Sequence, residues 1–220
     1  MINFKYNINE YRNPVEENYP GRVDILRLHS GFSLYLMRER KDTGISKLQE
    51  ICDKIDQIGR EMAPSGDYKL SIVGHSLGGA LATLCGFYIA ARSTKAGSCF
   101  ARLSRVNIWT FASPRVGTLD FVHAWQHLER TGRIRHARFA ATGDIVPLVP
   151  SCNFKSDDLH FYKHVGLQVQ LHSVVKNGKW SLQRNLDNLD VTYPLRHDWA
   201  SEIRRRFMHS HVSIITHISG

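Results

Sequence analysis

The stretch that decides the fold runs from residue 71 to residue 82 and reads SIVGHSLGGALA. Its β-branched pair Ile72-Val73 predicts the end of a strand. The uncharged run that follows, from residue 77 to residue 91, is too short to cross a bilayer and predicts a buried helix. Ser76 stands at this junction with glycines two positions away on either side. Such a serine is either a nucleophile or an inert turn residue.

The rest of the chain alternates predicted strands and helices around this stretch. Apolar residues at spacings of three and four predict a helix over 48–62, which Ser46 and Gln49 open as a capping box and Pro64 ends. Similar patterns predict strands at 68–73, 106–111 and 134–140 and helices at 78–92 and 120–130. This alternation predicts an α/β class with a largely parallel sheet, and 220 residues suffice for one domain over 1–220.

Later in the chain, Asn177-Gly178 predicts a hairpin between strands at 165–175 and 179–183. The chemistry is expected earlier, at the carboxyl ends of the parallel strands, where reactive groups gather in sheets of this class.

The overall composition is that of an ordinary globular protein, with 42% apolar and 22% charged residues. The net charge of +9 comes from scattered basic residues without a recognition motif, so no nucleic-acid partner is expected. Peripheral contact with an anionic lipid surface is the functional alternative to a solvated basic face. The first ten residues show no signal peptide, so a cytoplasmic location is the default expectation. The four cysteines lie far apart and are expected to be free thiols.

Residues 74–78 fit the pattern G-x-S-x-G, which has a mechanical reason. A sharp strand-to-helix turn lifts the serine hydroxyl out of the sheet and crowds the backbone, so the flanking positions favour glycine. The helix dipole then favours negative charge near Ser76, and the backbone N–H of Leu77 faces the oxyanion of a tetrahedral intermediate. The alternative is a glycine-rich turn with an inert serine. A strand before Ser76 and an apolar helix after it favour the nucleophile.

Five motifs in the same order resemble those of the class 3 lipases, the fungal and plant-type lipase family of α/β-hydrolases. They are LHSGF at 28–32, GHSLGGALA at 74–82, FASPRVG at 111–117, GDIVPLVP at 143–150 and YKHVG at 162–166. The third is similar to the family's F-G-S-P-R-V-G. The resemblance implies an α/β-hydrolase fold with helices on both faces of the sheet. It also implies hydrolysis of acyl-lipid or other esters through a Ser-His-Asp triad, without a cofactor.

The resemblance implies Asp144 as the triad acid, and the order Ser…Asp…His is that of α/β-hydrolases. The histidine is open between His209 and His211, because each fits one family spacing with an isoleucine in place of the aromatic residue. His164 matches a family position that is expected to be structural. If neither late histidine reaches Ser76, the chain has no complete triad.

The amino end departs from the family pattern. The family carries an F-R-G-T-like turn ahead of H-x-G-F, which supplies a second oxyanion donor and leads into a lid, and residues 1–30 hold no such turn. The expectation is therefore an N-terminally truncated domain. Two alternatives stay open, a lipase-like interaction module without catalysis and an esterase on feruloyl-type esters. His123 and His127 lie one helical turn apart, but without H-E-x-x-H no metal site is expected.

Overall fold

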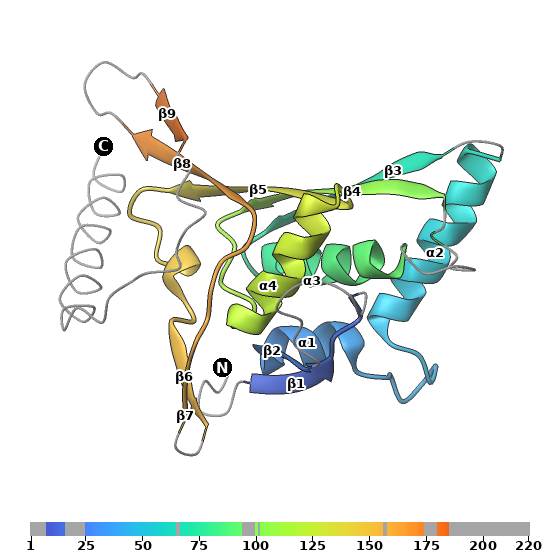
Figure 1. Cartoon of the computed structure of the whole chain (residues 1–220), viewed down its shortest axis with the longest axis horizontal. Coiled ribbons are helices and arrows are strands. Elements are labelled where there is room, and N and C mark those ends of the chain that lie inside the picture. The colour runs from blue at the N-terminus through green and yellow to red at the C-terminus, as the bar shows by residue number, and fades with distance from the viewer. Residues whose placement is uncertain are drawn as a thin grey trace.

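A five-stranded sheet with the strand order β3-β4-β5-β8-β9 is the centre of the computed structural model (Figure 1). The structure describes residues 8–15, 25–64, 67–93, 100, 102–155, 158–173 and 180–184. The first four strands run parallel and β9 pairs antiparallel with β8. Their bounds are β3 (Tyr68–His75), β4 (Leu103–Phe111), β5 (Ile134–Ala141), β8 (Leu167–Ser173) and β9 (Trp180–Arg184). The predicted parallel sheet is confirmed.

The helix predicted from the uncharged run is α3 (Leu77–Arg92), and it packs against β3 and β4. A Cβ atom added at Gly86 would lie 2.3 Å from Cδ1 of Ile108, so the helix backbone rests directly on the strand side chains. Nearly every residue from Gly79 to Ala91 is buried, as predicted.

Helix α4 (Leu119–Arg130) follows β4 and lies on the same side of the sheet as α3 (Figure 1). Aromatic rings join the two helices, because Phe87 of α3 meets Phe121 of α4 with ring centroids 4.9 Å apart. Trp125 stacks on Phe87 at 6.1 Å and is fully buried. This cluster is the aromatic part of the core beneath the sheet.

Helix α2 (Lys47–Met62) begins as predicted, since the side chain of Ser46 accepts a hydrogen bond from the Gln49 N–H. The reciprocal half of the capping box is not formed, because the Gln49 amide donates to Asp53 at 2.6 Å. The remaining described elements are two antiparallel strand pairs and two short helices. They are β1 (Ile8–Arg12) with β2 (Ile25–His29), β6 (Cys152–Lys155) with β7 (Asp158–Phe161), α1 (Ser30–Met37) and the 3₁₀ turn η1 (Val146–Leu148).

The predicted hairpin is confirmed by the antiparallel pairing of β8 with β9, and its Asn177-Gly178 turn lies outside the described residues. Strand β8 begins at Leu167, two residues later than predicted. Gly166 has a φ of +79°, which breaks the extended backbone just before it.

The face of the sheet opposite α3 carries exposed apolar side chains. Val73, Trp109 and Phe111 expose 65%, 37% and 41% of their surface there. Among the described residues no helix packs on this face, so the expected helices on both faces are confirmed for one face. None of the described helices has the length and apolar character needed to cross a bilayer.

The described cysteines Cys52, Cys85 and Cys152 are free thiols, as expected. Cys85 is buried in α3, and burial raises the pKa of its thiol to about 12. Cys99 lies outside the described residues.

Candidate active site

Ser76 stands between the last residue of β3 and the first residue of α3 with φ +52° and ψ −124°. A non-glycine residue rarely adopts a positive φ, and it persists only where the surroundings hold it. Here the Ser76 N–H donates to the Phe111 carbonyl at 2.9 Å, and the Ser76 carbonyl accepts the N–H of Gly79 at 2.9 Å. The sharp turn predicted from the sequence is therefore present and held from both sides.

The glycines around Ser76 differ in what they meet. A Cβ at Gly74 would lie 2.2 Å from the carbonyl oxygen of Gly78, and a Cβ at Gly79 would lie 2.8 Å from Cβ of Ser113. A Cβ at Gly78 would meet nothing within 4 Å. The close approach of β3 to the first turn of α3 therefore needs glycine at Gly74 but leaves room at Gly78.

The first turn of α3 carries no acidic residue, and the Ser76 side chain makes no capping hydrogen bond to it. The N–H groups of a helix's first turn have no partner within the helix and concentrate partial positive charge there. Leu77 is the first residue of this turn. Its backbone is thus placed where negative charge near Ser76 is favoured.

Asp144 follows the end of β5 and lies at the same edge of the sheet as Ser76. Because β3, β4 and β5 are parallel neighbours, their carboxyl ends meet at one edge. Two strand spacings separate β3 from β5, about 10 Å. The Asp144 Oδ1 accepts the N–H of Val146 at 2.9 Å, which fixes the carboxylate at the start of η1.

The two late histidines, His209 and His211, lie outside the described residues. His164 lies within the described residues and is held by the backbone, since its Nε2 lies 2.6 Å from the carbonyl oxygen of Pro147. Burial lowers the pKa of His164 well below its usual value, and the charges of Arg138 and Arg115 lower it further.

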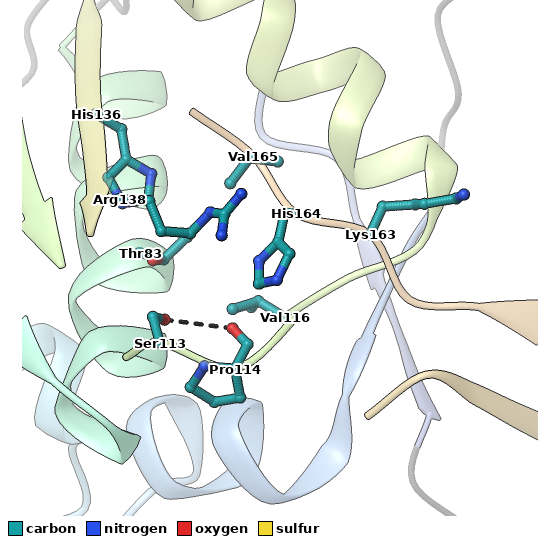
Figure 2. Close-up of a pocket in the computed structure, with 9 residues that line it drawn as sticks. All are labelled: Thr83, Ser113, Pro114, Val116, His136, Arg138, Lys163, His164 and Val165. Carbon is teal, nitrogen blue, oxygen red and sulfur yellow. Dashed lines mark hydrogen bonds between the residues drawn. The ribbon is translucent and has the colours of Figure 1, made fainter. Parts of the chain in front are cut away.

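A small pocket lies between α3, the segment after β4, β5 and the segment before β8 (Figure 2). The polar side chains that line it are Thr83, Ser113, His136, Arg138 and His164, and His164 faces the others from the segment before β8. Burial, followed by the charge of Arg138, lowers the pKa of His136 to about 3, so this imidazole is neutral near pH 7. Nε2 of His136 lies 2.8 Å from the hydroxyl of Thr110. The pocket is therefore lined by buried polar groups.

No three His, Cys, Asp or Glu side chains of the described ranges gather in a way that would hold a metal ion. His123 and His127 both lie on α4 and are half-buried.

A profile of the family described as Lipase (class 3) matches residues 2–154 of the 220. The chain belongs to the class 3 lipase family. Among curated relatives, Phospholipase A1-IIgamma of Arabidopsis thaliana is 31% identical over 137 residues, which cover 60% of this chain and 32% of the relative. A lipase of Rhizopus niveus is 30% identical over 129 residues, which cover 59% of this chain and 29% of the relative. This class 3 lipase chain spans about a fifth to a third of the length of the first curated relatives it matches.

Among solved structures, the Lip2 lipase of Yarrowia lipolytica is similar with a TM-score of 0.50 and 22% identity. The similarity covers 76% of this chain and 50% of the other. It shows the fold alone. The α/β-hydrolase fold expected from the motifs of a class 3 lipase is thus confirmed.

Two features of this class 3 lipase chain lay within motifs but received no role from the sequence. Ala112, with φ +51°, stands where the family motif F-G-S-P-R-V-G has a glycine, and that substitution was the signal of a strained position. Arg115 of the same motif binds carbonyl oxygens of the segment that follows Asp144. No local pattern marks this second contact, because its partners lie more than thirty residues away.

Proposed function

We propose that this chain is a serine carboxylic ester hydrolase of acyl lipids, with Ser76 as its nucleophile. The single observation that carries the proposal is the positive φ of Ser76 at the junction of β3 and α3. Strained backbone of this kind clusters at functional sites, and a strand–turn–helix context is what the G-x-S-x-G motif requires.

The proposed reaction is acyl transfer to Ser76 followed by hydrolysis. The Ser76 oxygen attacks the ester carbonyl while His209 or His211 accepts its proton, and Asp144 holds that imidazole in the correct tautomer. The N–H of Leu77 stabilises the oxyanion. The protonated histidine then donates its proton to the departing alcohol. Water, activated by the same histidine, releases the fatty acid and restores Ser76.

An acyl chain is the substrate class that the exposed side chains favour. Leu77, Ile145 and Val149 expose 43%, 39% and 44% of their surface, and they lie next to Ser76 or in the segment after Asp144. Exposed apolar side chains beside a polar reacting centre suit a lipid ester better than a sugar ester. The relatives named lipase and phospholipase A1 support the same class.

Labelling with a fluorophosphonate tests the nucleophile. The unaltered chain should be labelled, Ser76→Ala should not, and the exposed Ser71→Ala on the same strand should be labelled like the unaltered chain. Absence of labelling in the unaltered chain would support a lipase-like interaction module without catalysis. A preference for feruloyl esters over long-chain nitrophenyl esters would exclude the lipid substrate.

Single replacements decide between the two histidines. Loss of a triad base lowers kcat by several orders of magnitude, so one of His209→Gln and His211→Gln should be nearly inactive. The other should retain most of the activity. Equal and mild effects of both would mean that neither is the base.

Contact with an anionic lipid surface belongs to the same proposal, because the net charge is +9. The chain should sediment with phosphatidylglycerol vesicles at low salt and be released at high salt. Phosphatidylcholine vesicles are the control, and equal binding to both would contradict an electrostatic contact.

A further inference from the structure

The segment after Asp144 is anchored through four consecutive carbonyl oxygens, those of residues 147–150. The carbonyl of Pro147 lies 2.6 Å from Nε2 of His164. Nη1 of Arg115 donates to the carbonyl of Leu148 and, at 3.5 Å, to that of Pro150. The carbonyl between them, at residue 149, accepts the backbone N–H of Arg115 at 3.0 Å. Four consecutive carbonyls thus bind two residues from other parts of the chain.

These contacts reach the carboxylate through one short turn. The Asp144 Oδ1 accepts the N–H of Val146, which is the first residue of η1, and η1 continues to Leu148. The turn η1 therefore links the carboxylate to Arg115 and His164, because it carries both the N–H that binds Asp144 and the carbonyls of Pro147 and Leu148.

Arg115 and His164 themselves belong to a linked frame. Arg115 lies in the segment after β4 and His164 in the segment before β8, and the Lys163 N–H joins the two by donating to the Gly117 carbonyl at 2.8 Å. Ser113, two residues before Arg115, abuts Gly79 in the first turn of α3. One segment therefore touches both the first turn of α3, which follows Ser76, and residues 148–150, which follow Asp144.

We propose that Arg115 and His164 are positioning residues that hold Asp144 at its distance from Ser76 by binding the carbonyl oxygens of residues 147–150. This inference rests on the proposed function. Neither side chain touches the reacting atoms in this proposal. His164 serves as a neutral imidazole that donates through Nε2, because a carbonyl oxygen can only accept.

The hydrogen bonds from Arg115 and His164 are of a kind that fixes the position of the segment they bind. A hydrogen bond from an arginine to a carbonyl is stronger than one between neutral groups, and one guanidinium that binds two carbonyls fixes direction as well as distance. A displacement of about 1 Å near a reacting centre costs roughly a hundredfold in rate. Loss of either side chain should therefore lower kcat more than it raises KM.

The test uses steady-state hydrolysis of a nitrophenyl ester by the chain of residues 1–220. Arg115→Met and His164→Leu should each lower kcat about tenfold to a hundredfold with KM little changed. His164→Gln, whose amide can still donate to the Pro147 carbonyl, should recover much of the loss. Arg135→Gln, an exposed arginine on β5, is the matched control and should behave like the unaltered chain.

Repetition of the replacements in an Asp144→Asn background separates positioning from general stability. In that background Arg115→Met and His164→Leu should cause no further loss of kcat, because the carboxylate that Arg115 and His164 position is gone. Thermal unfolding shows whether Arg115→Met and His164→Leu are folded. If one of them is unfolded, Arg115→Lys or His164→Gln replaces it in the comparison of kcat between the two backgrounds. An equal loss in both backgrounds overturns the positioning role alone. An unaltered chain that hydrolyses no ester overturns the proposed function and the positioning role with it.

Discussion

Replacement of Gly74 by alanine is a direct test of the geometry around Ser76. The added Cβ would lie 2.2 Å from the Gly78 oxygen, 2.5 Å from the Gly78 carbonyl carbon and 2.8 Å from the Gly79 nitrogen. All three are backbone atoms, so no rotamer change relieves the overlap. Real Cβ atoms essentially never approach within 3.0 Å. The end of β3 and the first turn of α3 must therefore separate by roughly 0.8 Å.

This separation sets the expected loss of stability. Overpacking of a tight site costs about 1–3 kcal/mol, which for a chain of this size lowers the Tm by roughly 2–12 °C. Ser76 lies between the two parts that move apart. A displacement of about 1 Å there should reduce the esterase rate roughly a hundredfold.

Gly78→Ala is the matched control from the same motif. A Cβ there meets nothing within 4 Å, and alanine is favoured over glycine in helices by about 0.5–1 kcal/mol. This variant should have an equal or higher Tm and an activity within a few-fold of the unaltered chain. The assays are thermal unfolding by circular dichroism and hydrolysis of a nitrophenyl ester. If both variants were impaired alike, close backbone approach would not be the reason for glycine at Gly74.

Three further predictions concern strain, protonation and capping. Ala112→Gly should raise the free energy of unfolding by about 0.5–1 kcal/mol in urea titrations, because it relieves a φ of +51°, and no gain would contradict strain there. The pKa of His136 is about 3 when folded, below its value of 6.5 when unfolded, so the stability it contributes is full above pH 6.5 and is lost as pH falls toward 3. In urea titrations between pH 6 and pH 4, the free energy of unfolding of His136→Gln should fall less steeply with decreasing pH, by up to about 1.4 kcal/mol per pH unit. An unchanged slope would refute this role of His136. Ser46→Ala should cost about 1 kcal/mol through the lost cap of α2, whereas the exposed Ser71→Ala should cost less than about 0.5 kcal/mol, and equal costs would argue against the cap.

Local patterns in the sequence were sufficient for the main elements of the fold. The apolar stripe and the Ser46 cap predict α2, and the uncharged run predicts α3 to within one residue. These predictions succeed because helix period, capping and turn chemistry depend on residues within a few positions of one another. The same holds for the turn at Ser76, where strand, glycine and helix are adjacent in the chain. The roles of Asp144, His209 and His211 stay predictions, since no local pattern places these residues against Ser76.

The tertiary structure decided which of these residues meet. The motif treats Gly74 and Gly78 alike, but only Gly74 faces the backbone of the neighbouring helix turn. Arg115 and His164 reach the segment after Asp144 from 33 and 17 residues away, and nothing in their local sequence indicates this. Sequence alone therefore determined the elements and the turn that carries Ser76. The order of β3, β4 and β5 determined that Asp144 shares its edge, because contacts between distant residues depend on which strands become neighbours.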